Sequence, residues 1–268
     1  MQHERVTIRI DCTSASSPTV VFKMLSIDDK HVARLKLVLT RYKTPELPRP
    51  NTWKSRSDDD IWIRVVSQVA VIGNAKPAEK LKQHQYRDPI QWDLVAAVSD
   101  EDAAAAIWTV LREIGSRYAG KSLNKCGPTK SLVFNRNALR DFPGGPKGFL
   151  KSIATMKGDS IEKINFVTNR LQRIKNKGAR DFLTSGFGLV RDHIALDTRV
   201  KKCLQHIGIQ LPADAATNPS TYQQVEADLG SMLCEPLGIS LAELDQLLFT
   251  FASRITAMKW NGAASRET

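Results

Sequence analysis

The stretch that decides the fold lies between residues 171 and 204. It begins with Leu171-Gln-Arg-Ile-Lys-Asn-Lys-Gly-Ala-Arg-Asp-Phe-Leu183, passes through a glycine-containing turn, and continues as Ile194-Ala-Leu-Asp-Thr-Arg-Val200. This pattern predicts a helix, a basic hairpin, a second helix, a loop, and a third helix that starts with a capping residue. Lys177 falls on the second helix, and Asp197 begins the third about 20 residues later. These two side chains are the candidates for chemistry.

Each candidate has two interpretations. Lys177 stands among basic residues, where neighbouring cations disfavour an ammonium group and favour the free amine that attacks electrophilic carbon. The plainer interpretation is a solvated basic helix end. Asp197 in Leu196-Asp-Thr-Arg199 is a natural N-cap, and a carboxylate in that place can also accept a proton or stabilise a developing cation. Capping and catalysis do not exclude each other.

The remaining segments are typical of short helices. Asp58-Asp59-Asp60 places acidic groups at the positive end of a helix that continues to Val71. The apolar run from Ser240 to Met258 predicts one long helix. Alternation at residues 5–10 and 19–22 predicts two short strands. The sequence therefore predicts a mainly α fold, an orthogonal array of short helices with a helix-hairpin-helix motif, plus a small N-terminal β segment.

Composition narrows the kinds of partner. Lys and Arg outnumber Asp and Glu by 39 to 28, and the formal charge of +11 favours a polyanionic partner over a merely soluble basic protein. The four cysteines lack Cys-x-x-Cys spacing, so we expect reduced thiols and no zinc or iron–sulfur site. Because no long apolar run or signal-peptide pattern occurs, we expect no membrane association and an intracellular location, cytoplasmic and nucleoid-associated or nuclear.

The central stretch resembles a known family. Lys177-Gly-Ala-Arg-Asp-Phe-Leu183, Gly186-Phe-Gly188 and Ile194-Ala-Leu-Asp-Thr-Arg-Val200 are similar to the core of the helix-hairpin-helix DNA glycosylases, and most similar to the 8-oxoguanine DNA glycosylase/AP lyase branch. Trp62–Gln68 and Tyr222–Phe249 extend the similarity to roughly residues 55–255. One departure is clear, because Arg173 and Lys175 occupy hairpin positions where the family has glycines.

The resemblance implies a mechanism of base excision without a cofactor or metal. The damaged nucleotide is flipped out of double-stranded DNA, and Gln68 or a neighbour fills the gap. Asp197 stabilises the cationic sugar and helps to deprotonate Lys177, which attacks C1′ and leaves a Schiff base that collapses with strand cleavage. The implied DNA contacts are Gln68, Arg173, Ile174, Lys175, Asn176, Gly178, Arg180 and Arg199, and the implied base pocket is Asp181, Phe249, Phe251 and Trp260.

The resemblance also implies a domain organisation. Residues 1–50 form an N-terminal segment of two strands and a helix, and residues 51–268 form the glycosylase region, a monomer of two helical subdomains with the active site between them. The expected substrate is an oxidised purine, 8-oxoguanine. Two alternatives stay open: a monofunctional glycosylase for another modified base, in which a catalytic lysine is not needed, and a non-catalytic DNA-binding module on the same scaffold. A Phe pair on an apolar helix is also typical of a core.

Overall fold

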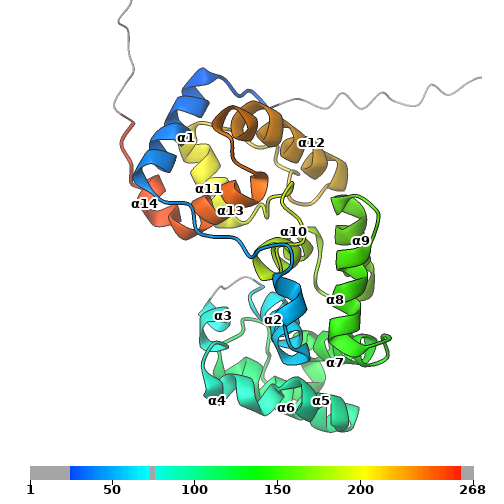
Figure 1. Cartoon of the computed structure of the whole chain (residues 1–268). Coiled ribbons are helices and arrows are strands. Elements are labelled where there is room, and N and C mark those ends of the chain that lie inside the picture. Colours follow the sequence, from blue (N-terminus) through cyan, green and yellow to red (C-terminus); the bar gives the residue numbers. More distant parts are fainter. Residues whose placement is uncertain (1–24, 73–75, 261–268) are drawn as a thin grey trace, which may run out of the picture.

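The computed structural model describes residues 25–72 and 76–260, and within these residues every regular element is helical. The predicted strands at residues 5–10 and 19–22 lie outside the described residues. Figure 1 shows two groups of helices with α10 between them. The helices are α1 (Asp29–Arg41), α2 (Asp58–Ala70), α3 (Lys76–Lys80), α4 (His84–Arg87), α5 (Trp92–Ala97), α6 (Asp100–Glu113), α7 (Gly127–Arg140), α8 (Gly145–Thr155), α9 (Ser160–Arg170), α10 (Asn176–Asp181), α11 (Thr198–Ile207), α12 (Pro219–Leu229), α13 (Leu241–Thr250) and α14 (Ala252–Thr256).

Capping residues fix where the predicted helices begin. At α2 the Ser57 hydroxyl accepts a hydrogen bond from the Asp60 amide at 3.0 Å, and the Asp60 carboxylate accepts one from the Ser57 amide at 3.2 Å. This reciprocal box satisfies two amides that a helix start leaves unpaired. The predicted start at Asp58-Asp59-Asp60 is therefore confirmed, and the helix ends at Ala70. None of the helices in the described residues is both long and apolar enough to span a bilayer.

The long helix predicted from Ser240 to Met258 is wrong. Helix α13 ends at Thr250, Phe251 has φ −104° and ψ 17°, and α14 starts at Ala252. The interruption lets the Phe251 ring stack on Tyr42, with ring centroids 4.8 Å apart. A single non-helical residue leaves the apolar content of the run unchanged, so periodicity does not reveal it.

The buried side chains form two separate clusters, one in each lobe. The first, lobe A, is built by residues between Ile61 and Val190 and includes Ala179 and Phe182 at the end of α10. The second, lobe B, combines α1 with α11–α14 and with Ile194 and Leu196. Helix α1, which was predicted to belong to an N-terminal segment, thus packs in lobe B. Lys177 is carried by a helix anchored in lobe A, whereas Asp197 is carried by a segment anchored in lobe B.

Candidate active site

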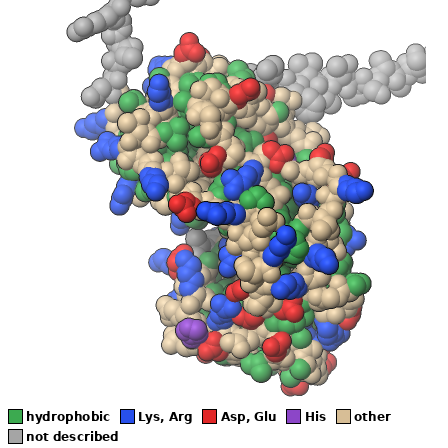
Figure 2. All heavy atoms as spheres, viewed as in Figure 1, with side chains coloured by type: hydrophobic (Ala, Val, Ile, Leu, Met, Phe, Trp, Pro, Cys, Tyr) green, Lys and Arg blue, Asp and Glu red, His purple; other side chains and the backbone are tan. Residues whose placement is uncertain are grey.

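A cleft of about 970 Å³ lies between the lobes and brings the two predicted catalytic residues together. Figure 2 shows an indentation between the lobes with Lys and Arg side chains along its rim. Both Lys177 and Asp197 line the cleft, together with Gln68, Asp181, Arg199 and Phe249 from the predicted set. Six of the predicted site residues, far apart in the sequence, therefore share one cavity.

The Asp197 carboxylate is oriented by its role as N-cap of α11. Its Oδ1 accepts hydrogen bonds from the amides of Arg199 and Val200, each at 2.8 Å. No described residue donates a hydrogen bond to Oδ2. Half-buried at the cleft wall, the group thus has one oxygen fixed by the helix start and a second one for a ligand. The predicted capping role is confirmed.

Lys177 is half-buried in α10 and lies close to two carboxylates. It interacts electrostatically with Asp181, one helical turn later, and with Asp245 on α13. The sequence predicted that basic hairpin residues surround it. Helix geometry explains the difference, because residues i and i+4 share a face, and that face turns Lys177 toward the cleft.

Asp181 is held as an anion by several donors. Burial alone would raise its pKa, but the Arg64 guanidinium at 3.1 Å, the Ser185 hydroxyl, the Gln68 amide at 2.6 Å and Lys177 outweigh it, so the pKa lies below the usual value. An ionised carboxylate only accepts hydrogen bonds. Asp181 therefore offers the cleft a fixed acceptor.

Asp245 is a cleft residue that the sequence reasoning missed. The residue is 3% exposed on α13, and its carboxyl group lies beside the Ala195 backbone. Burial, with the Asp181 and Asp197 charges, raises its pKa well above the usual value. The signal was available: Leu241-Ala-Glu-Leu-Asp245-Gln-Leu-Leu248 places an acid inside an apolar run, four residues before Phe249 and on the same helix face.

We expect Asp245 to make folding stability fall as pH rises. Because the folded pKa of Asp245 exceeds its unfolded value of 3.8, the folded state binds more protons at any pH between these two pKa values. The group therefore contributes its full stability below the unfolded pKa, and this stability is lost as the pH rises toward the folded pKa. Asp245→Asn cannot ionise. Its free energy of unfolding, relative to wild type, should increase by about 1.4 kcal/mol per pH unit within that window. Urea titrations at several pH values measure this, and parallel stability curves for the two proteins would contradict it.

Of the four residues predicted to form the base pocket, Asp181 and Phe249 line the cleft, and Phe251 and Trp260 do not. Phe249 on α13 is 37% exposed at the cleft, where the Arg199 guanidinium lies 4.7 Å from its ring centroid. Phe251 stacks on Tyr42 in lobe B instead. Trp260 donates its indole N–H to the His206 carbonyl at 2.8 Å and packs against the same lobe. The assignments of Phe251 and Trp260 to the pocket are therefore wrong, because both rings are committed to packing outside the cleft.

Solved structures of known proteins share this architecture. The 8-oxoguanine DNA glycosylase of Thermotoga maritima superposes with a TM-score of 0.53, at 21% identity, over 82% of this chain and 90% of that chain. The Methanocaldococcus jannaschii 8-oxoguanine DNA glycosylase gives 0.58, at 15% identity, over 84% and 97%. The chain has the fold of these glycosylases. A Methanocaldococcus jannaschii 8-oxoguanine glycosylase/lyase in complex with 15mer DNA containing 8-oxoguanine gives 0.57, at 14% identity, over 86% and 98%. No family model and no curated protein matches the sequence.

The turn between α9 and α10, where the sequence predicted a hairpin, places an arginine in a backbone conformation that favours glycine. Arg173 has φ +61°, the left-handed region that glycine adopts without steric cost. Its guanidinium lies over Gly127 at the start of α7, where a side-chain carbon on Gly127 would come within 2.6 Å of it. Ile174 is buried in lobe A, so its predicted DNA contact is limited to its backbone. Lys175 is exposed, and Asn176 and Gly178 are half-buried at the start of α10.

Replacing Arg173 should separate backbone strain from side-chain contacts. Arg173→Gly and Arg173→Ala both remove the guanidinium, but only glycine accepts a positive φ without strain. The glycine variant should be about 1 kcal/mol more stable than the alanine variant. Urea denaturation measures the difference. An alanine variant at least as stable as the glycine variant would show that the hairpin changes its backbone conformation when the arginine is lost.

Two predicted DNA contacts point inward. Arg180 is 2% exposed, and its guanidinium pairs with the Glu226 carboxylate at 2.7 and 2.6 Å, so it is not available to phosphate. Gln68 is 5% exposed, and its amide donates to Asp181, so the side chain does not project to fill a gap in a duplex. A carboxylate from a distant segment holds each side chain inside. This contradicts the predicted phosphate contact of Arg180, whereas the predicted DNA contact of Gln68, which lines the cleft, stays a prediction.

Proposed function

We propose that this protein is a DNA glycosylase that excises an oxidised purine, 8-oxoguanine, and cleaves the strand through a Schiff base on Lys177. The observation that carries the proposal is the placement of an amine and a cap-oriented carboxylate, Lys177 and Asp197, on one cleft between the lobes. A fold shared with 8-oxoguanine DNA glycosylases and a formal charge of +11 support it.

The geometry suggests how the residues would act. A base flipped into the cleft presents C1′ of its sugar to the two side chains. The Oδ2 atom of Asp197 stabilises the positive charge that develops on the sugar and accepts a proton from Lys177. The Lys177 amine then forms a bond to C1′ as the base leaves, and the resulting Schiff base permits β-elimination of the 3′ phosphate. These steps require no metal or cofactor.

The cleft walls suit a purine that carries an N7 hydrogen. Guanine offers N7 as an acceptor, whereas 8-oxoguanine offers an N7–H donor. The ionised Asp181 accepts such a bond and repels an unmodified acceptor. The exposed Phe249 ring, with Arg199 on one side of it, provides an apolar surface against which a base can stack. Asp245, whose pKa is raised well above the usual value, adds a donor to the same cavity at any pH where it is protonated.

A panel of duplexes, each with a single lesion, tests the proposal with the purified wild-type chain. Excision and strand cleavage at 8-oxoguanine, and not at guanine, is the expected result. Excision of another base without strand cleavage would favour a monofunctional glycosylase. Duplex binding without excision of any lesion would overturn the enzymatic proposal in favour of a binding module.

A further inference from the structure

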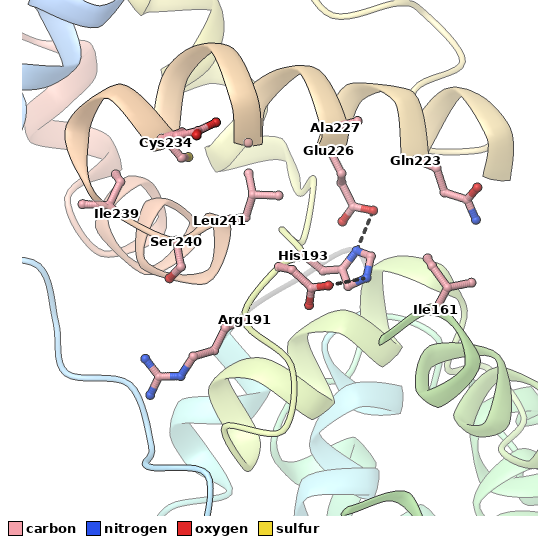
Figure 3. A pocket seen from close by; sticks show the side chains of 13 residues that line it. Ile161, Arg191, His193, Gln223, Glu226, Ala227, Cys234, Ile239, Ser240 and Leu241 are labelled. Carbon is pink, nitrogen blue, oxygen red and sulfur yellow. Dashed lines mark hydrogen bonds and ion pairs between the residues drawn. The ribbon is translucent and has the colours of Figure 1, made fainter. Parts of the chain in front are cut away.

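A buried ionic cluster lies outside the cleft and joins the lobes. The Glu226 carboxylate, 3% exposed on α12, accepts four hydrogen bonds: Oε1 from Arg180 Nε at 2.7 Å and the Ile194 amide at 3.0 Å, Oε2 from Arg180 Nη2 at 2.6 Å and His193 Nδ1 at 2.8 Å. Figure 3 shows Glu226 projecting from its helix toward His193. Four bonds fill the acceptor capacity of a carboxylate, so Glu226 has no lone pair left for a ligand.

Tyr222, one turn earlier on α12, extends the same connection. Its hydroxyl donates to the Ile194 carbonyl at 2.7 Å and accepts from the Leu196 amide at 2.8 Å. The Arg180 guanidinium lies 3.9 Å from its ring centroid. The backbone of residues 194–196, which leads directly into Asp197, is thus held by two α12 side chains, Tyr222 and Glu226. The same two side chains contact Arg180.

Arg180 completes the link to the other half of the reactive pair. It lies three residues after Lys177 on α10, and its Nη1 donates to the Asn176 carbonyl of the same helix at 3.3 Å. Helix α10 therefore presents Lys177 to the cleft, while Arg180, about one turn later on the same helix, is fixed to Glu226. A cavity of about 710 Å³ borders Glu226 and His193, and none of its lining residues lines the active-site cleft.

We propose that Glu226 is a positioning residue that sets the separation of Lys177 and Asp197. This inference rests on the proposed function. The two reactive groups belong to lobes with separate cores, so packing within either lobe leaves their separation undetermined. A bidentate arginine–carboxylate pair has a fixed geometry. The buried Arg180–Glu226 pair therefore fixes the position of α10 relative to the segment that leads into Asp197, because Glu226 also holds the Ile194 amide. Attack on C1′ is sensitive to the relative position of the two reactive groups, because a shift of about 1 Å costs on the order of 100-fold in rate.

Single-turnover kinetics on an 8-oxoguanine duplex test the proposal with Glu226→Gln in the full chain. The rate constant for excision should fall by about 100-fold, while duplex affinity stays at the wild-type value because Glu226 does not face the cleft. The matched control is Asp228→Asn on the same helix. Asp228 is also 3% exposed, but it bonds to the Leu25 amide and Gln224 instead of the segment before Asp197. This control should keep the wild-type rate constant.

The rate constant and the amplitude separate positioning from folding. Partial unfolding lowers the fraction of active molecules, and so the amplitude, whereas misplacement lowers the rate constant at full amplitude. An unchanged rate constant in Glu226→Gln, with an active wild type, would overturn the inference and leave the proposed function standing. An inactive wild type would instead overturn the proposed function.

A second variant decides the matter if Glu226→Gln does not fold. Tyr222→Phe keeps the ion pair and removes only the hydroxyl that bridges Ile194 and Leu196. Its rate constant should fall by about tenfold at full amplitude, since the segment loses part of its support. A wild-type rate constant in a folded Tyr222→Phe protein would overturn the inference.

Discussion

Replacing Lys177 by glutamine should abolish covalent trapping and strand cleavage. When a Schiff base is reduced with borohydride on an 8-oxoguanine duplex, the wild-type chain should form a stable protein–DNA crosslink, and Lys177→Gln should form none. The amide nitrogen of glutamine is not a nucleophile, so the bond to C1′ cannot form. We expect the rate of strand cleavage to fall by more than about 1,000-fold. Denaturing gels of the trapped and cleaved products measure both effects.

The matched control for this experiment is Lys175→Gln. Lys175 lies two residues earlier, is exposed, and does not line the cleft. It should crosslink as wild type does and bind the duplex somewhat more weakly, with a smaller dependence on salt, because one cation near the phosphates is lost. Equal crosslinking by Lys177→Gln and wild type would show that another amine forms the Schiff base. Excision without cleavage by Lys177→Gln would assign the lysine to the lyase step alone.

The positions that the sequence predicted best are those where local pattern decides the role. Asp197 precedes an amphipathic helix, so its cap followed from residue type alone, and the helix start at Asp58 followed in the same way. Lys177 and Phe249 were proposed from family resemblance, and the fold places both on one cavity. In each case the helical spacing that the sequence displays also sets the direction of the side chain.

The positions that the sequence did not predict depend on partners far along the chain. Arg180 looked like a phosphate contact until the fold brought Glu226 to it, 46 residues away in sequence. Asp245 and Glu226 sit in ordinary amphipathic helices. Only tertiary packing raises the pKa of Asp245 in the cleft and buries Glu226 among its hydrogen-bond donors. Phe251 and Trp260 were named for their rings, but a ring in an apolar segment is buried by whichever lobe it meets, here lobe B.

Replacing Asp197 by asparagine should remove the chemistry and leave the fold unchanged. Asparagine caps a helix about as well as aspartate, so the amides of Arg199 and Val200 keep an acceptor and the melting temperature should stay near that of wild type. The neutral amide neither accepts the Lys177 proton nor stabilises a cationic sugar, so the excision rate constant should fall by roughly 100- to 10,000-fold. Duplex binding should persist, because the change removes a negative charge from a surface that faces phosphate.

Two further variants make this result specific to Asp197. Asp197→Ala loses the cap as well as the charge and should be about 1 kcal/mol less stable than Asp197→Asn at the same low activity. Asp159→Asn makes the same chemical change at the N-cap of α9, where the carboxylate accepts a bond from the Glu162 amide at 2.8 Å. Because Asp159 is not among the cleft residues, this variant should keep wild-type stability and activity. Asp197→Asn excising at the wild-type rate would mean that the carboxylate is only a cap, since the cap is the one role that the substitution preserves.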